Sequence, residues 1–217
     1  MNIALILSGG VGTRLGGDIP KQYRVVGDAP IISYCLETLV NHEEIDAIQI
    51  VADPVWRDFV SESMNGSEWK QKMHGFSLPG ENRQLSIWNG LQDICSYAGE
   101  EDAVLIHDCL QGLVGYGGVL PVLPMKDTVY LSEDGKEISS LLDRKQIFAG
   151  QAPEVFRLGA YCRANQALLP DRILTINGST EVAVMAGMKV HMISGDERNF
   201  KITTAEDLQR FERLVTA

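Results

Sequence analysis

Residues 7–23, LSGGVGTRLGGDIPKQY, follow directly on a short apolar run from Ile3 to Leu7, and this transition decides the fold. Glycines at positions 9, 10, 12, 16 and 17 let the backbone turn closely enough for main-chain N–H groups to contact an anion. Arg14 and Lys21 place two permanent cations beside that turn. A strand that runs into such a loop is typical of an α/β fold, and we predict a phosphate site here.

The spacing of these glycines excludes two common phosphate-binding motifs. GGVGTRLGG does not give G-x-G-x-x-G in register, and no Gly-Lys-Ser/Thr follows as a Walker loop requires. What remains is a loop for a nucleoside triphosphate whose phosphates are held by Arg and Lys. A purely structural glycine-rich loop is the alternative interpretation.

The length and charge of the chain limit what surrounds this loop. With 217 residues, 45% of them apolar, we expect one domain spanning residues 1–217. A net charge of −10 disfavours nucleic acid or an anionic membrane as a partner, because both need a basic face. A polyanionic ligand must therefore be held by a few placed Lys and Arg side chains.

The four cysteines are Cys35, Cys95, Cys109 and Cys162, and no two of them form a CxxC pair. Their spacing favours buried free thiols over a zinc or dithiol site. The N-terminus lacks the basic start of a signal peptide, and no run approaches the roughly 20 apolar residues of a membrane helix. We expect a cytoplasmic protein.

Short apolar runs alternate with segments of helical period, which predicts a three-layer αβα, Rossmann-like sandwich around a mostly parallel sheet. The expected strands are 3–7, 47–51, 75–78, 103–107 and 119–123, and the expected helices are 30–40, 54–64 and 82–97. A last helix follows Thr204, which with Asp207 resembles a capping box that has Asp in place of Glu or Gln.

One segment breaks the alternation. Residues 126–147, KDTVYLSEDGKEISSLLDRKQI, carry β-prone flanks on either side of Asp134-Gly135 and predict a hairpin arm. Two strands have little core of their own, so the arm is expected to pack on something else. A second subunit is the simplest candidate, and we expect a homodimer through this arm.

Several motifs in one order give the chain a specific resemblance. Gly-Gly-x-Gly-Thr-Arg-Leu ends in Pro20-Lys21-Gln22-Tyr23, and further matches occur at 80–91, 104–108, 124–128, 143–154 and 199–203. Together they resemble the CTP-dependent cytidylyltransferases that act on alditol phosphates, the family of the 2-C-methyl-D-erythritol 4-phosphate and ribitol-5-phosphate enzymes. The resemblance implies a fold of the nucleotide-diphospho-sugar transferase type, and it implies that the arm reaches into the neighbouring subunit's site.

The resemblance also implies a role for individual residues. Arg14, Lys21 and Lys201 would be the catalytic cations, and Asp108 would help to hold Mg²⁺. Thr128 and Arg144, again with Lys201, would bind the phosphate of the acceptor. The cytidine nucleotide would be held by Leu7, Ser8, Gly9, Gly10, Gly12, Gly80, Arg83 and Ser86.

Purely structural interpretations of some of these residues remain as alternatives. Ser86 lies at the start of a helix, where its hydroxyl could serve the local backbone alone. Arg83 and Arg144 could be surface ion-pair residues, and His107 a hydrogen-bonded strand end.

The chain departs from the family after His107-Asp108, where an Arg-Pro pair and about a helix's worth of residues, some ten to fifteen, are absent. Two explanations stay open: a true deletion, or an omitted segment between these two residues. In the second case Asp108 ends the missing helix and is not the metal ligand.

The implied activity is transfer of CMP from CTP to an alditol phosphate, with release of pyrophosphate. In the family Thr-Pro-Gln is common where this chain has Gln151-Ala152-Pro153-Glu154, and Thr-Asp-Glu is usual near Gly178-Ser179-Thr180-Glu181, so a Thr hydroxyl and an Asp carboxylate that would meet the acceptor are altered. The Leu-Ser-Gly-Gly start favours a ribitol 5-phosphate-like acceptor over methylerythritol phosphate. Two other hypotheses are a CTP-binding relative without turnover and a sugar-1-phosphate nucleotidyltransferase.

Overall fold

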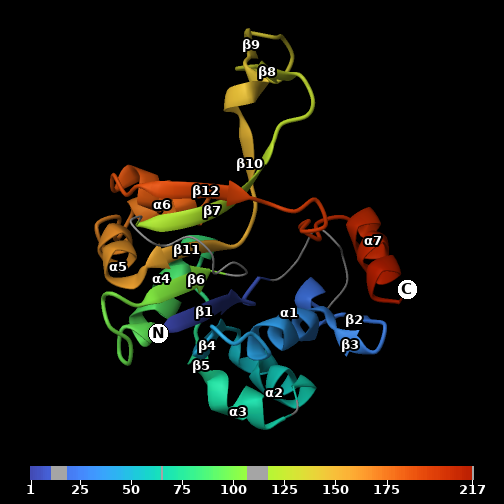
Figure 1. Cartoon of the computed structure of the whole chain (residues 1–217), viewed down its shortest axis with the longest axis vertical. Coiled ribbons are helices and arrows are strands. Elements are labelled where there is room, and N and C mark those ends of the chain that lie inside the picture. The colour runs from blue at the N-terminus through green and yellow to red at the C-terminus, as the bar shows by residue number, and fades with distance from the viewer. Residues whose placement is uncertain (11–18, 65, 107–116, 217) are drawn as a thin grey trace.

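A computed structural model describes residues 1–10, 19–64, 66–106 and 117–216. Its centre is an eight-stranded sheet with helices on both faces (Figure 1). The strand order is β10-β7-β11-β6-β1-β4-β5, and β12 also pairs with β7, along residues 118–122. The bounds are β1 Asn2–Leu7, β4 Ala47–Val51, β5 Met73–Ser77, β6 Ala103–Ile106, β7 Gly118–Pro124, β10 Phe148–Gly150, β11 Glu154–Arg157 and β12 Val190–Ser194.

The predicted sheet is confirmed as mostly parallel. The pairs β1·β4, β1·β6, β4·β5 and β7·β12 are parallel. β11 runs antiparallel between β6 and β7, and β10 runs antiparallel to β7. β6, β7 and β12 therefore share the direction of β1, and their carboxyl ends lie at one edge of the sheet.

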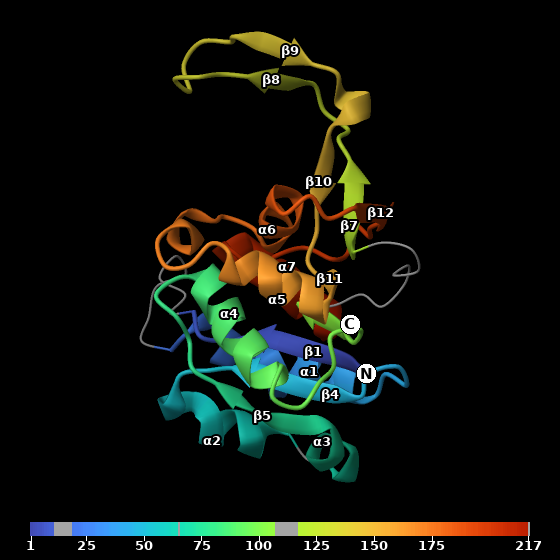
Figure 2. The same cartoon turned by 90° about the vertical axis from the view of Figure 1, so that its left-hand side faces the viewer.

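Alternate side chains of β1 build the two halves of the core. Ile3 and Leu5 belong to the cluster under α4, α5 and α6, whereas Ala4 and Ile6 belong to the cluster under α1, α2 and α3. The period of two along a strand explains this division, because successive side chains point to opposite faces. Figure 2 shows the two helical layers on either side of the sheet. The bounds are α1 Ile31–Val40, α2 Pro54–Ser63, α3 Ser67–Lys72, α4 Arg83–Ile94, α5 Leu158–Gln166 and α6 Ser179–Met185.

The predicted elements are present, with shifted ends. The expected helix at 82–97 ends at Ile94, because Ser96 and Tyr97 close tight turns after it. The strand expected at 75–78 begins two residues earlier, at Met73, and ends at Ser77. The last helix, α7 Ala205–Val215, has the predicted capping box: Asp207 N–H donates to the Thr204 hydroxyl, and the Asp207 carboxylate accepts from Thr204 N–H.

The hairpin arm stands clear of the sheet (Figure 1). It starts where the β7–β10 ladder ends and consists of β8 Val129–Leu131, β9 Ser140–Leu142 and the short helix η3 Arg144–Gln146. Asp134-Gly135 does not form a two-residue turn. It belongs to an eight-residue loop, residues 132–139, in which the Asp134 carboxylate accepts from the N–H groups of Lys136 and Glu137.

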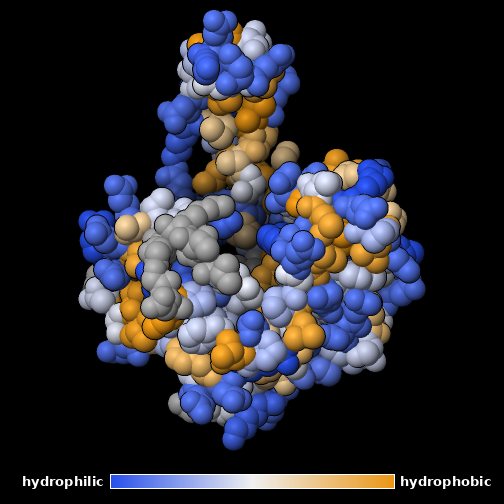
Figure 3. All heavy atoms as spheres, turned by 180° about the vertical axis from the view of Figure 1, so that it is seen from behind, coloured by the Kyte–Doolittle hydropathy of each residue, from blue (hydrophilic) through white to orange (hydrophobic). Residues whose placement is uncertain are grey.

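The arm exposes large apolar side chains. Among them are Tyr130, Leu131, Ile138 and Leu141, each at least 47% exposed. Figure 3 shows apolar surface along the part of the arm nearest the body. In the described part of the chain, no helix is long and apolar enough to cross a membrane.

Candidate functional site

The sequence motifs converge on the edge where the parallel strands end. β1 runs into Ser8-Gly9-Gly10, β5 runs into Leu78-Pro79-Gly80, and the arm grows out beyond the end of β7. β11 begins at the same edge, because Glu154 pairs with Ile106 at the end of β6. In open α/β sheets, ligands bind outside the carboxyl ends of the strands. This edge is therefore the candidate site.

Ser8 and the predicted Pro-Lys-Gln-Tyr segment hold each other in place. The Ser8 hydroxyl donates to the Tyr23 oxygen at 2.8 Å, and the Tyr23 hydroxyl donates to the Ser8 carbonyl at 2.9 Å. The Gln22 amide donates to the carbonyls of Ser8 and Gly10, at 2.8 and 2.7 Å. Burial raises the pKa of Tyr23, so the phenol stays protonated as a donor. These bonds fix the start of the glycine-rich loop at residues 8–10.

Gly9 and Gly80 are glycines because neighbouring atoms leave no room for a side chain. A Cβ on Gly9 would lie 2.5 Å from Cβ of Pro79, and a Cβ on Gly80 would lie 2.4 Å from Cβ of Leu85. The two predicted nucleotide segments, 8–10 and 78–80, are thus in contact through Gly9 and Pro79. The close approach allows the backbone at this edge to face a ligand without intervening side chains.

Ser86 connects Gly80 to the start of α4. Its hydroxyl accepts from Gly80 N–H at 2.9 Å and donates to the Asn82 carbonyl at 2.9 Å. Asn82 caps the helix by accepting from Leu85 N–H at 2.8 Å. The interpretation of Ser86 as a residue that serves the local backbone therefore describes its contacts within the chain, because its hydroxyl joins the loop at Gly80 to the start of α4.

Lys21 reaches across the molecule to the segment that carries Lys201. Its ammonium group donates to the Ile202 carbonyl at 2.6 Å, over a sequence separation of 181 residues. Residues 196–199 are held in turn by Gln151, which precedes β11, because its side-chain amide donates to the carbonyls of Asp196 and Asn199. Asn199 donates back to the Ala152 carbonyl at 2.7 Å. The two catalytic lysines implied by the family resemblance thus come from segments that meet at this edge.

Arg83 lies among different partners from Ser86, although both belong to the first turn of α4. Its guanidinium group donates to the Ser179 hydroxyl at 2.5 Å and lies 3.8 Å from a carboxylate oxygen of Glu154. Desolvation raises the pKa of the Glu154 carboxyl, and the nearby Arg83 opposes that rise. Among the described contacts, this ion pair fits the interpretation of Arg83 as a structural residue better than its interpretation as a nucleotide ligand.

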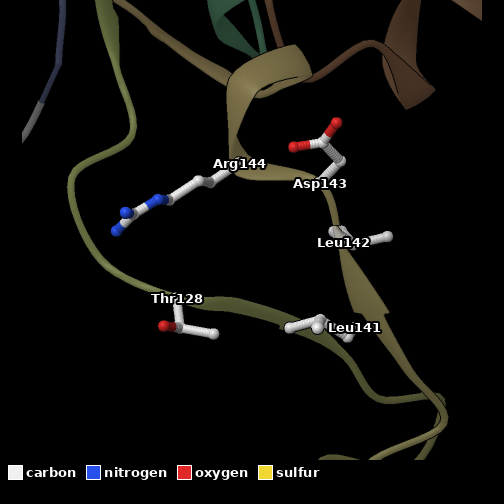
Figure 4. A pocket seen from close by; sticks show the side chains of 5 residues that line it. All are labelled: Thr128, Leu141, Leu142, Asp143 and Arg144. Carbon is white, nitrogen blue, oxygen red and sulfur yellow. The ribbon is translucent and has the colours of Figure 1, made fainter.

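Thr128 and Arg144 come together on the arm, away from the lysines. They line a hollow with Leu141, Leu142 and Asp143 (Figure 4). Arg144 extends across the hollow towards the segment that carries Thr128, and its guanidinium group donates to the Lys126 carbonyl at 2.7 Å. No contact among the described residues joins Thr128 or Arg144 to Lys201. Lys126 forms an ion pair with Glu197, which fixes the base of the arm to the segment before Lys201.

Several predicted site residues lie outside the described residues: Gly12, Arg14, His107 and Asp108. His107 and Asp108 lie in the connection between Ile106 and Gly118, which has eleven residues. A crossover between parallel strands usually takes a dozen or more residues and includes a helix. The connection from β6 to β7 is therefore at the short limit for its topology, and both a true deletion and an omitted segment stay open as explanations.

Several residues with structural roles at this edge were absent from the sequence prediction. Gln22, Asn82, Gln151 and Asn199 hold the four segments of the site in position. Each belongs to a motif that carried the family resemblance, and this membership was the only signal available. Their long-range partners could not be predicted, because a side-chain amide bonds equally well to many carbonyl groups.

The described residues include no group of three His, Cys, Asp or Glu side chains that could hold a metal ion.

Comparisons with known proteins agree with the sequence resemblance. The chain matches the family described as "IspD: 2-C-methyl-D-erythritol 4-phosphate cytidylyltransferase" over residues 2–217. It is 32% identical to the 2-C-methyl-D-erythritol 4-phosphate cytidylyltransferase of Geobacter metallireducens, covering 98% of this chain and 96% of that protein. It is 30% identical to the ribitol-5-phosphate cytidylyltransferase of Streptococcus agalactiae serotype III, covering 100% and 96%.

The alignment with the streptococcal relative spans 234 positions, more than the 217 residues of this chain, so that relative has residues without a counterpart here. The chain also spans about half, 55%, of the bifunctional enzyme IspD/IspF of Paramagnetospirillum magneticum, with 30% identity.

Solved structures show the same fold. A 4-diphosphocytidyl-2C-methyl-D-erythritol synthase superposes with a TM-score of 0.78 at 25% identity, covering 99% of this chain and 98% of that one. The synthase of Anaerococcus prevotii superposes with a TM-score of 0.79 at 20% identity, covering 100% and 98%.

Proposed function

Because this chain belongs to the family of 2-C-methyl-D-erythritol 4-phosphate cytidylyltransferases, we propose that it transfers CMP from CTP to the phosphate of an alditol phosphate and releases pyrophosphate. The observation that carries the proposal is the bond from Lys21 to the Ile202 carbonyl. It joins the phosphate loop to the segment of Lys201 at the edge where the nucleotide loops meet.

The reaction needs no nucleophile from the protein. An oxygen of the acceptor phosphate attacks the α-phosphorus of CTP, a new P–O bond forms, and the bond between the α-phosphorus and the bridging oxygen breaks. That oxygen leaves with pyrophosphate. The acceptor phosphate is largely dianionic near neutral pH, because its second pKa is about 6.

The protein must therefore bring two polyanions together and neutralise the charge on the leaving oxygens. We assign this role to Arg14, Lys21 and Lys201, and nucleotide binding to the backbone of residues 7–10, Gly12 and Gly80, supported by Ser86. Because the chain carries a net charge of −10, these local cations supply the positive potential that the reaction needs. Magnesium bound to the triphosphate would supply further charge neutralisation, with Asp108 as the candidate protein ligand.

Thr128 and Arg144 would bind the acceptor phosphate in a neighbouring subunit's site. Two features support this arrangement: the hollow with Arg144 lies on an arm that projects from its own body, and the arm exposes Tyr130, Leu131 and Leu141. A homodimer would cover these apolar side chains and place Arg144 opposite the partner's Lys201. The site would then be complete only in the dimer.

For the acceptor we prefer a ribitol 5-phosphate-like polyol, with methylerythritol phosphate as the second candidate. The Leu-Ser-Gly-Gly start of the phosphate loop favours the first. The relatives carry both names at similar identity, so the choice rests on an assay.

The deciding experiment measures pyrophosphate release with CTP, Mg²⁺ and a panel of alditol phosphates. We expect release with ribitol 5-phosphate and less with methylerythritol phosphate. Binding of CTP without release across the panel would instead identify a nucleotide-binding relative without turnover. Preference for UTP or dTTP over CTP would support a sugar-1-phosphate nucleotidyltransferase.

Replacing Lys21 with alanine tests the proposed cation. We expect turnover to fall by about 10² to 10³, the usual effect of removing one group that stabilises developing charge, while the circular dichroism spectrum is retained. Lys70→Ala is the matched control, because Lys70 is exposed on α3, which precedes β5 and lies away from the carboxyl edge. Near-normal turnover in Lys21→Ala would contradict the assignment.

Mixing two inactive variants tests whether the arm acts on its neighbour. In a heterodimer of Lys21→Ala and Arg144→Ala, one site combines an intact body with an intact arm from the partner. Random mixing should then restore about a quarter of the parent activity, because half of the dimers are mixed and each has one intact site. If the arm serves its own body, neither site is intact and the mixture stays inactive.

A further inference from the structure

Two cysteines from distant parts of the chain lie against each other. The sulfur atoms of Cys95 and Cys162 are 3.1 Å apart, although 67 residues separate them in the sequence. Cys95 follows directly on the last residue of α4, and Cys162 lies within α5. Both are free thiols. A disulfide bond is about 2.05 Å long, so the two sulfurs need to approach by only about 1 Å to form one.

The pair is open to a small oxidant. Cys95 is exposed and Cys162 is partly buried. A surface hollow of about 300 Å³ is lined by both cysteines together with Gly99, Glu100, Arg163 and Gln166. The hollow lies between the end of α4 and α5, on the helical layer and not at the carboxyl edge that carries the candidate site.

The two thiols differ in their surroundings. Burial, and then contact with Cys95, raises the pKa of Cys162 far above that of an ordinary thiol. Arg163 lies beside the pair, but it is bonded to the Glu100 carboxylate at 2.7 Å, which offsets its charge. Because the thiolate is the form that reacts, the exposed Cys95 should be oxidised first and the buried Cys162 should then attack it.

We propose that Cys95 and Cys162 form a reversible intramolecular disulfide when the protein meets a two-electron oxidant such as hydrogen peroxide. The Cys95 thiolate attacks one peroxide oxygen, the O–O bond breaks, and after protonation the products are a sulfenic acid and one water. The Cys162 sulfur attacks the Cys95 sulfur, the S–O bond breaks, and the hydroxyl group leaves as a second water with the thiol proton. Two thiols and one peroxide thus give one disulfide and two waters.

The disulfide would tie α4 to α5 without moving the nucleotide loop. Cys95 lies nine residues after Ser86, about 13 Å along the helix axis. At the other end of α4, Gln84 already donates to Asn165 of α5 at 2.6 Å. We therefore expect the oxidised protein to be harder to unfold and to bind nucleotide as before.

The test uses a Cys35→Ser/Cys109→Ser variant, in which Cys95 and Cys162 are the two remaining thiols. Titration of the denatured protein should give two thiols per chain before peroxide treatment and none after it, with a mass loss of two hydrogens. Dithiothreitol should restore both thiols. The unfolding temperature should rise by about 4 to 16 °C on oxidation, the range expected for a disulfide in a chain of this size.

Adding Cys95→Ser to this variant provides the matched control. It should keep one thiol, gain no stability from peroxide and unfold at the temperature of the reduced parent. Three outcomes would overturn the proposal: two thiols that persist after peroxide, loss of thiols through bonds between chains, or a stable mass gain of oxygen on Cys95 with Cys162 still free.

Discussion

Replacing Gly80 with alanine should disturb both the fold and the nucleotide loop. The new methyl carbon would lie 2.4 Å from Cβ of Leu85, 2.7 Å from the Leu85 carbonyl carbon and 2.8 Å from the Ser86 nitrogen. Two of these atoms belong to the backbone of the first turn of α4, which cannot rotate away as a flexible side chain could. The loop must therefore move away from the helix, and the bond from Gly80 N–H to the Ser86 hydroxyl, 2.9 Å long, is lost.

The size of the effect follows from these two losses. Forcing an extra methyl group into a filled space costs about 1 to 3 kcal/mol, and a lost hydrogen bond adds about 1 kcal/mol. We expect the free energy of unfolding to fall by about 2 to 4 kcal/mol in total. For a domain of this size this corresponds to a fall of about 5 to 15 °C in unfolding temperature.

Urea unfolding followed by circular dichroism measures this difference. Ser86→Ala removes this hydrogen bond and the one from the Ser86 hydroxyl to the Asn82 carbonyl without adding an atom, and it should lose about 1 to 2 kcal/mol. Gly10→Ala is the control for added volume, because among the described residues no heavy atom beyond the adjoining residues lies within 4 Å of its new methyl carbon. It should change stability by less than about 0.5 kcal/mol. A Gly80→Ala protein as stable as the Gly10→Ala protein would refute the steric argument.

Two further predictions concern pH. Desolvation raises the pKa of the Glu154 carboxyl, so the folded state disfavours its charged form and loses stability as the pH rises through the folded pKa. Glu154→Gln should therefore raise the unfolding temperature at pH 8, and the gain should vanish near pH 4. A parent protein more stable than the variant at pH 8 would contradict this. Bonds from Thr203 and Thr204 hold the pKa of the Asp207 carboxyl well below its usual range, so its cap is intact above the ordinary carboxyl pKa of about 3.9 and is lost only below it. Amide exchange at the start of α7 should be faster in Asp207→Asn at pH 7. Equal exchange in the two proteins would show that the cap does not hold the helix.

The sequence predicted the elements whose apolar pattern is strong. The strand at 47–51 is buried at every position and was predicted with the ends that the structure has. The capping box at Thr204 was predicted from two residues, because the bond it makes is local.

The missed elements lack such a pattern. β12 has no fully buried residue and alternates weakly, so its sequence gives only a weak strand signal. β11 has only four residues, and β2 Val25–Val26 and β3 Ala29–Pro30 have two each, too few for a period to be recognised. The helices α3, α5 and α6 were also absent from the prediction.

The amino-acid sequence by itself determined the α/β class, the glycine-rich anion loop, the arm at 126–147 and the family, because each depends on residues close together in the chain. Only the tertiary structure decided that Lys21 meets the segment of Lys201, that Arg83 pairs with Glu154, and that Cys95 lies against Cys162. The physical reason is that short-range patterns fix which element forms, whereas contacts between distant side chains depend on how strand order and helix packing place them in space.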